Sequence, residues 1–457
     1  MASITVLHIT AHLGGGVGRA LSQLACYRRA SGSQVEDAFV SLEKPQTRSY
    51  VDRITACGAK VLVAPAAGEL DALIAAADLV QLEWWHHPLL AAWMNRNPIP
   101  PARLVVWAHT SGLHYPVIPP VFTIQPHAFL LTSEISLRRL DRQGHPRGNI
   151  LAVVSSTGGF DDLPFPRREA HNHPRFGYLG SLNPAKLHPD IVSYLDAVDL
   201  PGFRVDFYGD VFANPQLQSW AEKAGPTSRL ALRGYTDSPG SALSGMDVFV
   251  YLLNPTHYGT TENALLEAMA CGVVPVVLNN PVEETIVQNG ITGLVVDSPR
   301  SFADAITWLV RHPQERLRLS AACATVRDSY SVGNSAGQLD AIYRRVVDEP
   351  KRCFEFNRIF GNSPADWFLS CLGSYSRHFS EESEICGREE RLQYPFLYER
   401  TKSSVFQFLS CFPADPRLAR WAAMLERDLC GPSVPLTGRP PIGNSIRFSL
   451  GGQPACR

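Results

Sequence analysis

Residues 254–279, NPTHYGTTENALLEAMACGVVPVVLN, contain a glycine loop, a helix and a strand in one continuous stretch. The part from about 262 to 270 consists almost entirely of strong helix formers. A hydroxyl of Thr260 or Thr261 can cap its first turn, and Gly272 can end it. We therefore predict a short helix that directly follows a glycine-containing loop.

The apolar run after this helix, residues 273–278, has the length and β-branching of a strand buried on both faces. Such a strand is typical of a parallel sheet, whose carboxyl edge lies next to the N-termini of the helices. The loop before the helix then presents backbone N–H groups and the positive end of the helix dipole. This is where α/β proteins bind phosphate groups.

The length and charge of the chain narrow the class of protein. A chain of 457 residues is too long for one hydrophobic core, so we expect at least two domains. With 45% hydrophobic and 19% charged residues, the composition is that of a soluble globular protein. The 42 basic and 43 acidic residues nearly cancel, which argues against a nucleic acid as the main partner.

The ten cysteines are scattered, and none forms a Cys-x-x-Cys pair, so a zinc or redox motif is not supported. The N-terminus begins as a strand and lacks the basic and apolar regions of a signal peptide. No apolar stretch approaches the roughly 20 residues that span a bilayer. We expect a cytoplasmic protein with reduced thiols, and peripheral membrane contact stays open.

Residues 1–160 show the alternation of a doubly wound α/β domain. A strand at 4–9, a glycine loop at 13–19 and a helix at about 19–29 resemble the opening of a nucleotide-binding unit. The dinucleotide fingerprint fails, because its third glycine would fall on Arg19. Three consecutive glycines favour the close approach of a ligand, and a tight turn without a ligand is the alternative. Further strands are expected at 38–42, 60–63, 78–82, 103–107, 128–131 and 150–154.

Unusual side chains follow two of these strands, where the loops of a parallel sheet line the ligand cleft. Trp84 and Trp85 predict a stacking floor for a sugar ring, and packing against the next helix is an equally good interpretation. His109 lies directly past a buried strand, beside the hydroxyls of Thr110 and Ser111. It is a candidate functional histidine, and a hydrogen-bonded core histidine is the alternative.

Residues 155–173 are rich in proline, glycine and polar residues and predict a linker. A second Rossmann-like domain is expected over 170–347. Its strands are predicted at 176–179, 203–208, 230–233, 248–252, 273–278 and 293–296. Residues 348–457 break the pattern and predict a helical extension with a disordered tail. Helices that brace the two domains are the favoured role for this extension.

The two glycine-loop domains resemble the GT-B fold. The stretch from Glu262 to Val277, followed by NGITGLVV at 289–296, is similar to the "glycosyl transferases group 1" family. Members of that family are retaining enzymes that use nucleotide sugars. The resemblance covers about residues 4–347 and is most specific over 260–296. It implies an α/β GT-B protein with an acceptor domain followed by a donor domain.

The donor-site signature of the family is a glutamate, seven residues and a second glutamate. Glu267 matches the second glutamate, which bonds the nucleotide ribose in relatives, whereas Gly259 stands at the first. Relatives also hold the donor diphosphate with an arginine and a lysine. Lys186 matches the lysine, whereas Ser181 stands at the arginine position. Glu262 can replace the missing glutamate, or it is a first-turn acid that offsets the helix dipole.

The resemblance implies further site residues. His109 lies where relatives place a histidine beside the transferred sugar, and together with Lys186 and Glu262 it forms the predicted catalytic set. The predicted donor-binding residues are Gly15, Gly16, Lys186, Gly209, Tyr258, Gly259, Thr260, Thr261 and Glu267. The predicted acceptor-binding residues are Trp84, Trp85, His86 and Tyr115.

The leading hypothesis is a glycosyltransferase that moves a sugar from a nucleotide-diphosphate sugar to an acceptor hydroxyl with retention. A sugar, a lipid-linked sugar or another hydroxyl compound would be the acceptor, in surface polysaccharide or glycoconjugate synthesis. No metal or other cofactor is expected, because no Asp-x-Asp motif follows a strand. The alternatives are a non-catalytic nucleotide-sugar-binding relative and a sugar-nucleotide epimerase. A dehydrogenase is a less favoured hypothesis, because the dinucleotide fingerprint fails. The oligomeric state stays open.

Overall fold

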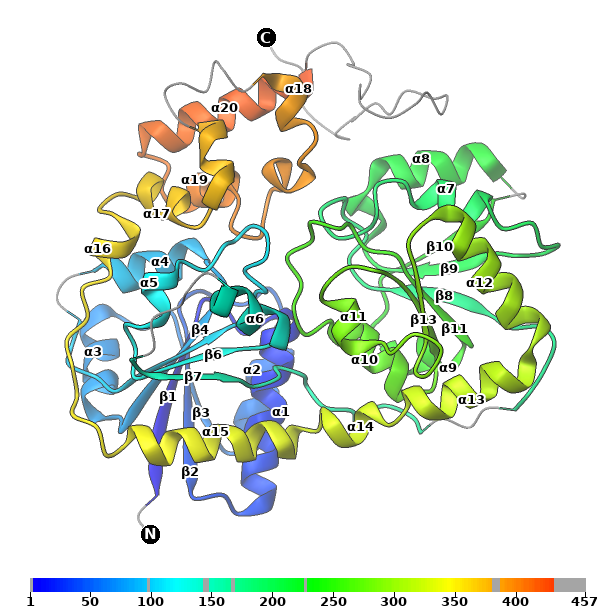
Figure 1. The fold of residues 1–457 in the computed structure, drawn as a ribbon. Coiled ribbons are helices and arrows are strands. Elements are labelled where there is room, and N and C mark those ends of the chain that lie inside the picture. Colours follow the sequence, from blue (N-terminus) through cyan, green and yellow to red (C-terminus); the bar gives the residue numbers. More distant parts are fainter. Residues whose placement is uncertain are drawn as a thin grey trace.

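The computed structural model describes residues 3–96, 99–142, 148–165, 169–225, 228–379 and 387–430. These residues form two parallel sheets flanked by helices and a helical C-terminal part (Figure 1). The predicted α/β GT-B class is therefore confirmed. The predicted disordered tail falls within residues 431–457, which lie outside the described part of the chain.

The first sheet has the strand order β3-β2-β1-β4-β5-β6-β7, and its paired strands all run parallel. Its strands are β1 (Ile4–Thr10), β2 (Val35–Ser41), β3 (Lys60–Val63), β4 (Leu79–Trp84), β5 (Leu104–Ala108), β6 (Ala128–Leu131) and β7 (Ile150–Val153). Its helices are α1 (Gly15–Ser31), α2 (Ser49–Ala56), α3 (Ala67–Ala76), α4 (Pro88–Asn95), α5 (Pro120–Thr123) and α6 (Glu134–Arg142). The order reverses between β1 and β4, which creates a ligand-binding switch point at their carboxyl ends.

The second sheet repeats this plan with the order β10-β9-β8-β11-β12-β13. Its strands are β8 (Phe176–Leu179), β9 (Val205–Tyr208), β10 (Leu230–Gly234), β11 (Val248–Tyr251), β12 (Val274–Leu278) and β13 (Leu294–Val296). Its helices include α7 (Ile191–Asp196), α8 (Pro215–Ala224), α9 (Pro239–Ser244), α10 (Asn263–Ala270) and α11 (Glu283–Ile286). The neighbouring strands β11 and β12 are buried throughout, as their apolar sequences predict. The switch point here lies between β8 and β11.

The chain then returns to the first sheet. Helices α12 (Pro299–Arg311), α13 (Pro313–Cys323) and α14 (Val326–Ser329) lead to α15 (Val332–Val346), which runs beneath the first sheet beside α1 (Figure 1). Leu339 and Tyr343 of α15 are fully buried in the same core cluster as Phe39 of β2. Although α15 follows the second sheet in sequence, it completes the core of the first.

The helical extension packs over the first sheet's domain. It contains α16 (Asn357–Phe360), α17 (Pro364–Ser370), η3 (Gly373–Phe379), α18 (Arg388–Arg391), η4 (Pro395–Tyr398), α19 (Val405–Cys411) and α20 (Pro416–Cys430). Its aromatic residues form a core cluster that also takes in Ala91 and Tyr115 of the first domain and Ala185 of the second. The extension thus contacts both domains.

Two expectations from the sequence are wrong. Helix α1 begins at Gly15, not at Arg19, because Gly14 is an extended N-cap and the glycines form the first turn themselves. Cys26 and Cys57 form a disulfide with a Cα–Cα distance of 5.3 Å, so the thiols are not all reduced. The packing of α1 against α2 brings these two distant cysteines together.

Within the described ranges, none of the helices is both long enough and apolar enough to cross a bilayer.

We predict that Leu339→Ala destabilises the first domain by about 2–5 kcal/mol, because the substitution leaves a cavity in a closed core. Hydrogen exchange should speed up in β1 and β2 and stay unchanged in β11 and β12. Arg344→Ala, at an exposed position of the same helix, should leave exchange in both sheets unchanged. Faster exchange in the second sheet alone would contradict the placement of α15.

Candidate functional site

The N-termini of α1 and α10 meet between the two domains. A Cβ atom on Gly16, in the first turn of α1, would lie 3.0 Å from Nδ2 of Asn263, the first residue of α10. Gly15 has a φ of +57°, and nothing lies within 4 Å of the position of its Cβ. Each helix follows a strand at the switch point of its own sheet. Two positive helix ends therefore face a common space suited to an anion.

The predicted threonine cap of α10 is wrong. Glu262 is the N-cap residue, in a left-handed conformation with a φ of +49°, and its side chain does not cap the helix. The two threonines bind the first domain instead. Thr260 forms hydrogen bonds with Thr132 at 2.8 Å and with Ser133 at 3.1 Å, and Thr261 bonds Ser156 at 3.1 Å. They therefore hold the loop against the carboxyl end of the first sheet.

Lys186 and Glu262 form a buried ion pair at the start of α10. The Lys186 ammonium donates to Glu262 Oε2 at 2.5 Å, and the Tyr251 hydroxyl donates to the same oxygen at 2.6 Å. The Glu262 side chain is only 1% exposed. Burial alone would raise the pKa of this carboxyl group, but Lys186, His257 and the hydrogen bonds hold its pKa at about 2. Glu262 is therefore an ionised, buried group and not a solvated first-turn acid.

The glycine at 259 is a consequence of this pair. A Cβ atom on Gly259 would lie 1.6 Å from Glu262 Oε1 and 2.7 Å from Lys186 Nζ. No side chain fits there unless the ion pair moves. The carboxylate of Glu262 thus occupies the space beside the position where the family pattern has its first glutamate.

Glu267 lies on the buried side of α10 and faces the first domain. Its carboxylate is 3.3 Å from Arg19 Nε, and Arg19 also donates to Asp162 at 2.8 Å. Burial raises the pKa of Glu267, although Arg19 opposes this effect. Arg233 in the second domain pairs with Asp206 at 2.8 Å.

His109 follows β5 and is held by a buried carboxylate of β4. Its Nε2 lies 2.7 Å from Oε2 of Glu83. Burial would raise the pKa of Glu83, but hydrogen bonds from His109 and His8 hold this pKa at about 2. Glu83 is therefore ionised and accepts a hydrogen bond from His109. Nε2 of His109 therefore carries a proton and donates it to Glu83, and Nδ1 is the ring atom that remains for another partner.

A row of charges extends from Glu83 through the first sheet. His8 lies between two carboxylates, with Nδ1 2.8 Å from Glu83 and Nε2 3.0 Å from Asp37. Burial lowers the pKa of His8, but the two carboxylates outweigh this effect and raise it. Asp37 in turn accepts from Arg28 at 2.5 Å. The charges alternate in sign, so each buried ion has a partner.

Several buried polar atoms near the helix ends have no hydrogen-bond partner among the described residues. They are His109 Nδ1, Thr110 Oγ1, Glu262 Oε1 and Asn263 Oδ1. The Thr132 hydroxyl, which contacts both Thr260 and the carbonyl of Ala108, links the two loops that carry them. Because unpaired buried polar groups are costly, such a group of atoms favours a polar ligand at this place.

Three of the four predicted acceptor residues are buried in this structure. Trp84 is 1% exposed and packs on Phe122 inside the first domain. His86 is also 1% exposed, and Tyr115 stacks on Phe396 of the extension. The sequence could not show that the extension contacts His86, through Phe408, and Tyr115. Trp85 remains half-buried.

Trp85 has two histidine neighbours that the sequence analysis missed. The rings of His12 and His87 lie 5.4 and 6.2 Å from it. With Glu43 they form a cluster whose ligand atoms lie within 4.8 Å of one another. His87, however, accepts the Leu89 N–H with Nδ1 and has its Nε2 3.0 Å from the amide of Gln407. Both of its ring nitrogens are therefore engaged, which argues against a metal ion here.

The remaining donor-site predictions have structural explanations. Gly209 packs on the backbone of Gly180, since a Cβ atom there would lie 2.2 Å from the Gly180 carbonyl oxygen. Tyr258 lies between two lysines: Lys186 is 5.7 Å from the centre of its ring, and Lys402 is 4.7 Å from it. Lys402 comes from the extension, and no motif in the sequence connected it to this site.

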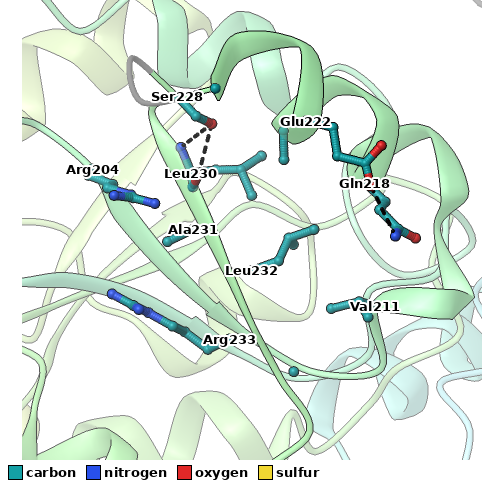
Figure 2. A pocket seen from close by; sticks show the side chains of 12 residues that line it. Arg204, Val211, Gln218, Glu222, Ser228, Leu230, Ala231, Leu232 and Arg233 are labelled. Atoms are coloured by element: carbon teal, nitrogen blue, oxygen red, sulfur yellow. Dashed lines mark hydrogen bonds between the residues drawn. The ribbon is translucent and has the colours of Figure 1, made fainter.

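A cavity of about 420 Å³ lies elsewhere, at the outer edge of the second sheet. Figure 2 shows Arg233 of β10, Arg204 just before β9, and Gln218 and Glu222 of α8 around it. It does not include the helix ends, Lys186 or Glu262. We therefore place the candidate site between the domains and not in this cavity.

Residues 160–324 match the model of the family described as "Glycosyl transferases group 1". No curated protein sequence matches the chain. The predicted enzyme class, a glycosyltransferase, is confirmed at this level.

Solved structures share the fold at low sequence identity. HepE of Anabaena in complex with UDP has a TM-score of 0.60 at 15% identity, covering 75% of this chain and 100% of that one. A glycosyltransferase from Rickettsia africae has a TM-score of 0.58 at 13% identity, covering 76% and 100%. The pneumococcal O-GlcNAc transferase GtfA in complex with UDP and GlcNAc has a TM-score of 0.57 at 12% identity, covering 76% and 100%.

We predict that Glu262→Gln destabilises the second domain by about 3–5 kcal/mol, because it leaves the buried Lys186 without its counter-charge. The double variant with Lys186→Met should cost less than the sum of the two single changes, by about 0.5–3 kcal/mol. Hydrogen exchange of β11 and β12 measures these energies. Strictly additive effects would show that the two side chains do not interact.

We also predict a pH effect from Glu83. Its folded pKa is lowered from 4.5 to about 2. The stabilisation from Glu83 is therefore fully present above 4.5 and is lost as the pH falls through about 2. In urea unfolding between about pH 5 and about pH 3, Glu83→Gln should lose stability less steeply than the wild type. Glu36→Gln, at an exposed position of β2, is the control and should follow the wild type.

Proposed function

We propose that this glycosyltransferase moves a sugar from a nucleotide-diphosphate sugar to an acceptor hydroxyl, with retention of the anomeric configuration. The observation that carries the proposal is the meeting of the α1 and α10 N-termini beside the Lys186–Glu262 pair. Free N–H groups, two helix dipoles and a fixed ammonium group suit a diphosphate better than any uncharged ligand.

In this proposal the donor lies between the domains. The first turns of α1, with Gly15 and Gly16, and of α10 bind the diphosphate, and Lys186 lies beside it. Glu267 lies on the ribose side, as the family pattern implies. The similar structures of HepE and GtfA contain UDP, which supports a nucleotide donor for this fold.

The transfer step requires groups that stabilise charge on the leaving group. The bond between the anomeric carbon and the diphosphate oxygen breaks, and a bond from that carbon to the acceptor oxygen forms. The acceptor's hydroxyl proton passes to the departing phosphate oxygen. Lys186 and the helix ends then stabilise the nucleoside diphosphate anion.

Two unpaired acceptor atoms suit the transferred sugar. Nδ1 of His109 and Oε1 of Glu262 are both buried, and neither has a hydrogen-bond partner among the described residues, although Glu262 Oε1 lies 3.6 Å from His257 Nδ1. Each can accept a hydrogen bond from a sugar hydroxyl. Glu262 would then bind the sugar hydroxyls in place of the glutamate that the family pattern has at position 259.

The acceptor is proposed to bind on the first domain at Trp85, whose ring remains accessible at the cleft edge. His12, whose ring lies 5.4 Å from that of Trp85, adds a polar group there. We propose a role in the cytoplasm, in surface polysaccharide or glycoconjugate synthesis, by analogy with the family. No metal ion enters the proposed step.

The test is transfer by the purified full-length chain, with UDP-, GDP- and ADP-sugars against a panel of sugar and lipid-linked acceptors. NMR of the product reports the anomeric configuration. Binding without any turnover would favour the non-catalytic alternative, and a changed donor sugar without an acceptor would favour the epimerase. A product with the inverted anomeric configuration would contradict the proposed retention but not the proposed sugar transfer.

We predict that Lys186→Ala lowers kcat by about a hundredfold to a thousandfold, because it removes a fixed charge next to the leaving group. Glu267→Ala should mainly raise KM for the donor, by about tenfold or more. Lys223→Ala, at an exposed position of α8, should match the wild type. Wild-type rates in both site variants would contradict the proposed site.

A further inference from the structure

A loop of the C-terminal extension, residues 399–404, contacts both domains. Lys402 in this loop donates a hydrogen bond from Nζ to the Tyr258 hydroxyl at 2.8 Å. The same ammonium group lies 4.7 Å from the centre of the Tyr258 ring. Tyr258 belongs to the loop that leads into α10, so the extension contributes a cation to the predicted donor side.

The loop is held from both domains. On the first domain, Ser403 donates to the carbonyl of Trp85 at 3.0 Å, and the Tyr115 hydroxyl donates to the carbonyl of Ser403. On the second domain, Asn183 donates to Glu399 at 2.9 Å. These contacts explain why the predicted acceptor residue Tyr115 is buried: it positions this loop.

The backbone of the loop is strained where the lysine lies. Lys402 and Ser403 have φ angles of +54° and +71°, which side-chain-bearing residues adopt rarely. The Ser403 N–H is held by Gln407 at 2.6 Å. Consecutive strained residues persist only when the surrounding contacts impose them, and here the result is a fixed direction for the Lys402 side chain.

The two lysines at Tyr258 differ in their charge balance. Lys186 is neutralised by Glu262 at 2.5 Å. For Lys402 no ion pair is found within the described ranges, and its side chain remains accessible to water. Desolvation lowers the pKa of Lys402, but Tyr258, Glu399 and Glu262 outweigh it and raise that pKa. Lys402 is therefore a charged group whose ammonium is not neutralised by a carboxylate among the described residues, and it can bind an anion.

We propose that Lys402 is a diphosphate-binding residue of this enzyme, supplied by the extension in place of the arginine that the family pattern has at Ser181. The proposal rests on the proposed function. With Lys186 on the other side of Tyr258, it places a second ammonium group beside the leaving group. When the bond to the anomeric carbon breaks, this cation stabilises the charge that develops on the diphosphate.

The test compares nucleotides that differ by one phosphate. Calorimetry with the full-length chain measures the Kd of UDP, GDP and ADP and of the corresponding monophosphates. Lys402→Gln should weaken binding of the preferred diphosphate by about ten- to a hundredfold, with a smaller effect on the monophosphate. Lys402→Arg should restore most of the diphosphate affinity, because it keeps the charge.

Arg420→Ala is the matched control, since it removes an exposed cation from α20 of the same extension and should leave both affinities unchanged. The melting temperature without nucleotide should be the same in Lys402→Gln and the wild type. A lower melting temperature with equal loss of both nucleotides would overturn the proposal, because Lys402 would then only fasten the loop.

An unchanged Kd of the diphosphate in Lys402→Gln would also overturn the proposal that Lys402 binds the diphosphate. The failure of the proposed function is a different result. If the wild type binds a diphosphate through Lys402 but transfers no sugar, this proposal stands and the transferase reaction does not. If the wild type binds no nucleoside diphosphate at all, both proposals fail.

Discussion

The structure of the loop before α10 depends on the buried ion pair between Lys186 and Glu262. Two ions that are removed from water need close mutual contact and further hydrogen bonds, because desolvation otherwise exceeds their attraction. Tyr251 supplies one such bond at 2.6 Å, and Gly259 leaves the space that the carboxylate fills. The left-handed backbone at Glu262 is the local cost of aiming that carboxylate at Lys186. The loop before α10 therefore has one arrangement that satisfies all of these groups.

This arrangement depends on contacts between the domains. The loop is fixed against the first domain by Thr260 and Thr261, and Glu267 of the following helix lies 3.3 Å from Arg19 of α1. Helix α15 returns to the first core, and the extension adds contacts with both domains. The donor side is thus built from three parts of the chain that are far apart in sequence. Motion of the domains relative to each other would change the geometry of the site directly.

The first domain carries a second buried charge arrangement that ends at the cleft. The arrangement consists of two carboxylates and the basic side chains that lie between and beside them. The carboxylates are Asp37 and Glu83, and the basic side chains are Arg28, His8 and His109. The consequence for His109 is a fixed ring orientation, since the ionised Glu83 accepts its Nε2 proton. An imidazole fixed in this way offers one lone pair in one direction, which suits the recognition of a hydroxyl group.

The sequence by itself determined the fold class and most strands to within two residues. Those predictions rest on short-range patterns: apolar runs, glycine stops and helix formers that act on neighbouring residues. The tertiary structure decided what is buried and what is paired. Trp84, His86 and Tyr115 are polar or aromatic residues at strand ends, but the packing of the core and of the extension encloses them. The partners of Glu262 and the presence of Lys402 in the cleft arise from contacts between residues far apart in the chain. No local pattern encodes such contacts, because they are energetically favourable only after both domains and the extension have closed around them.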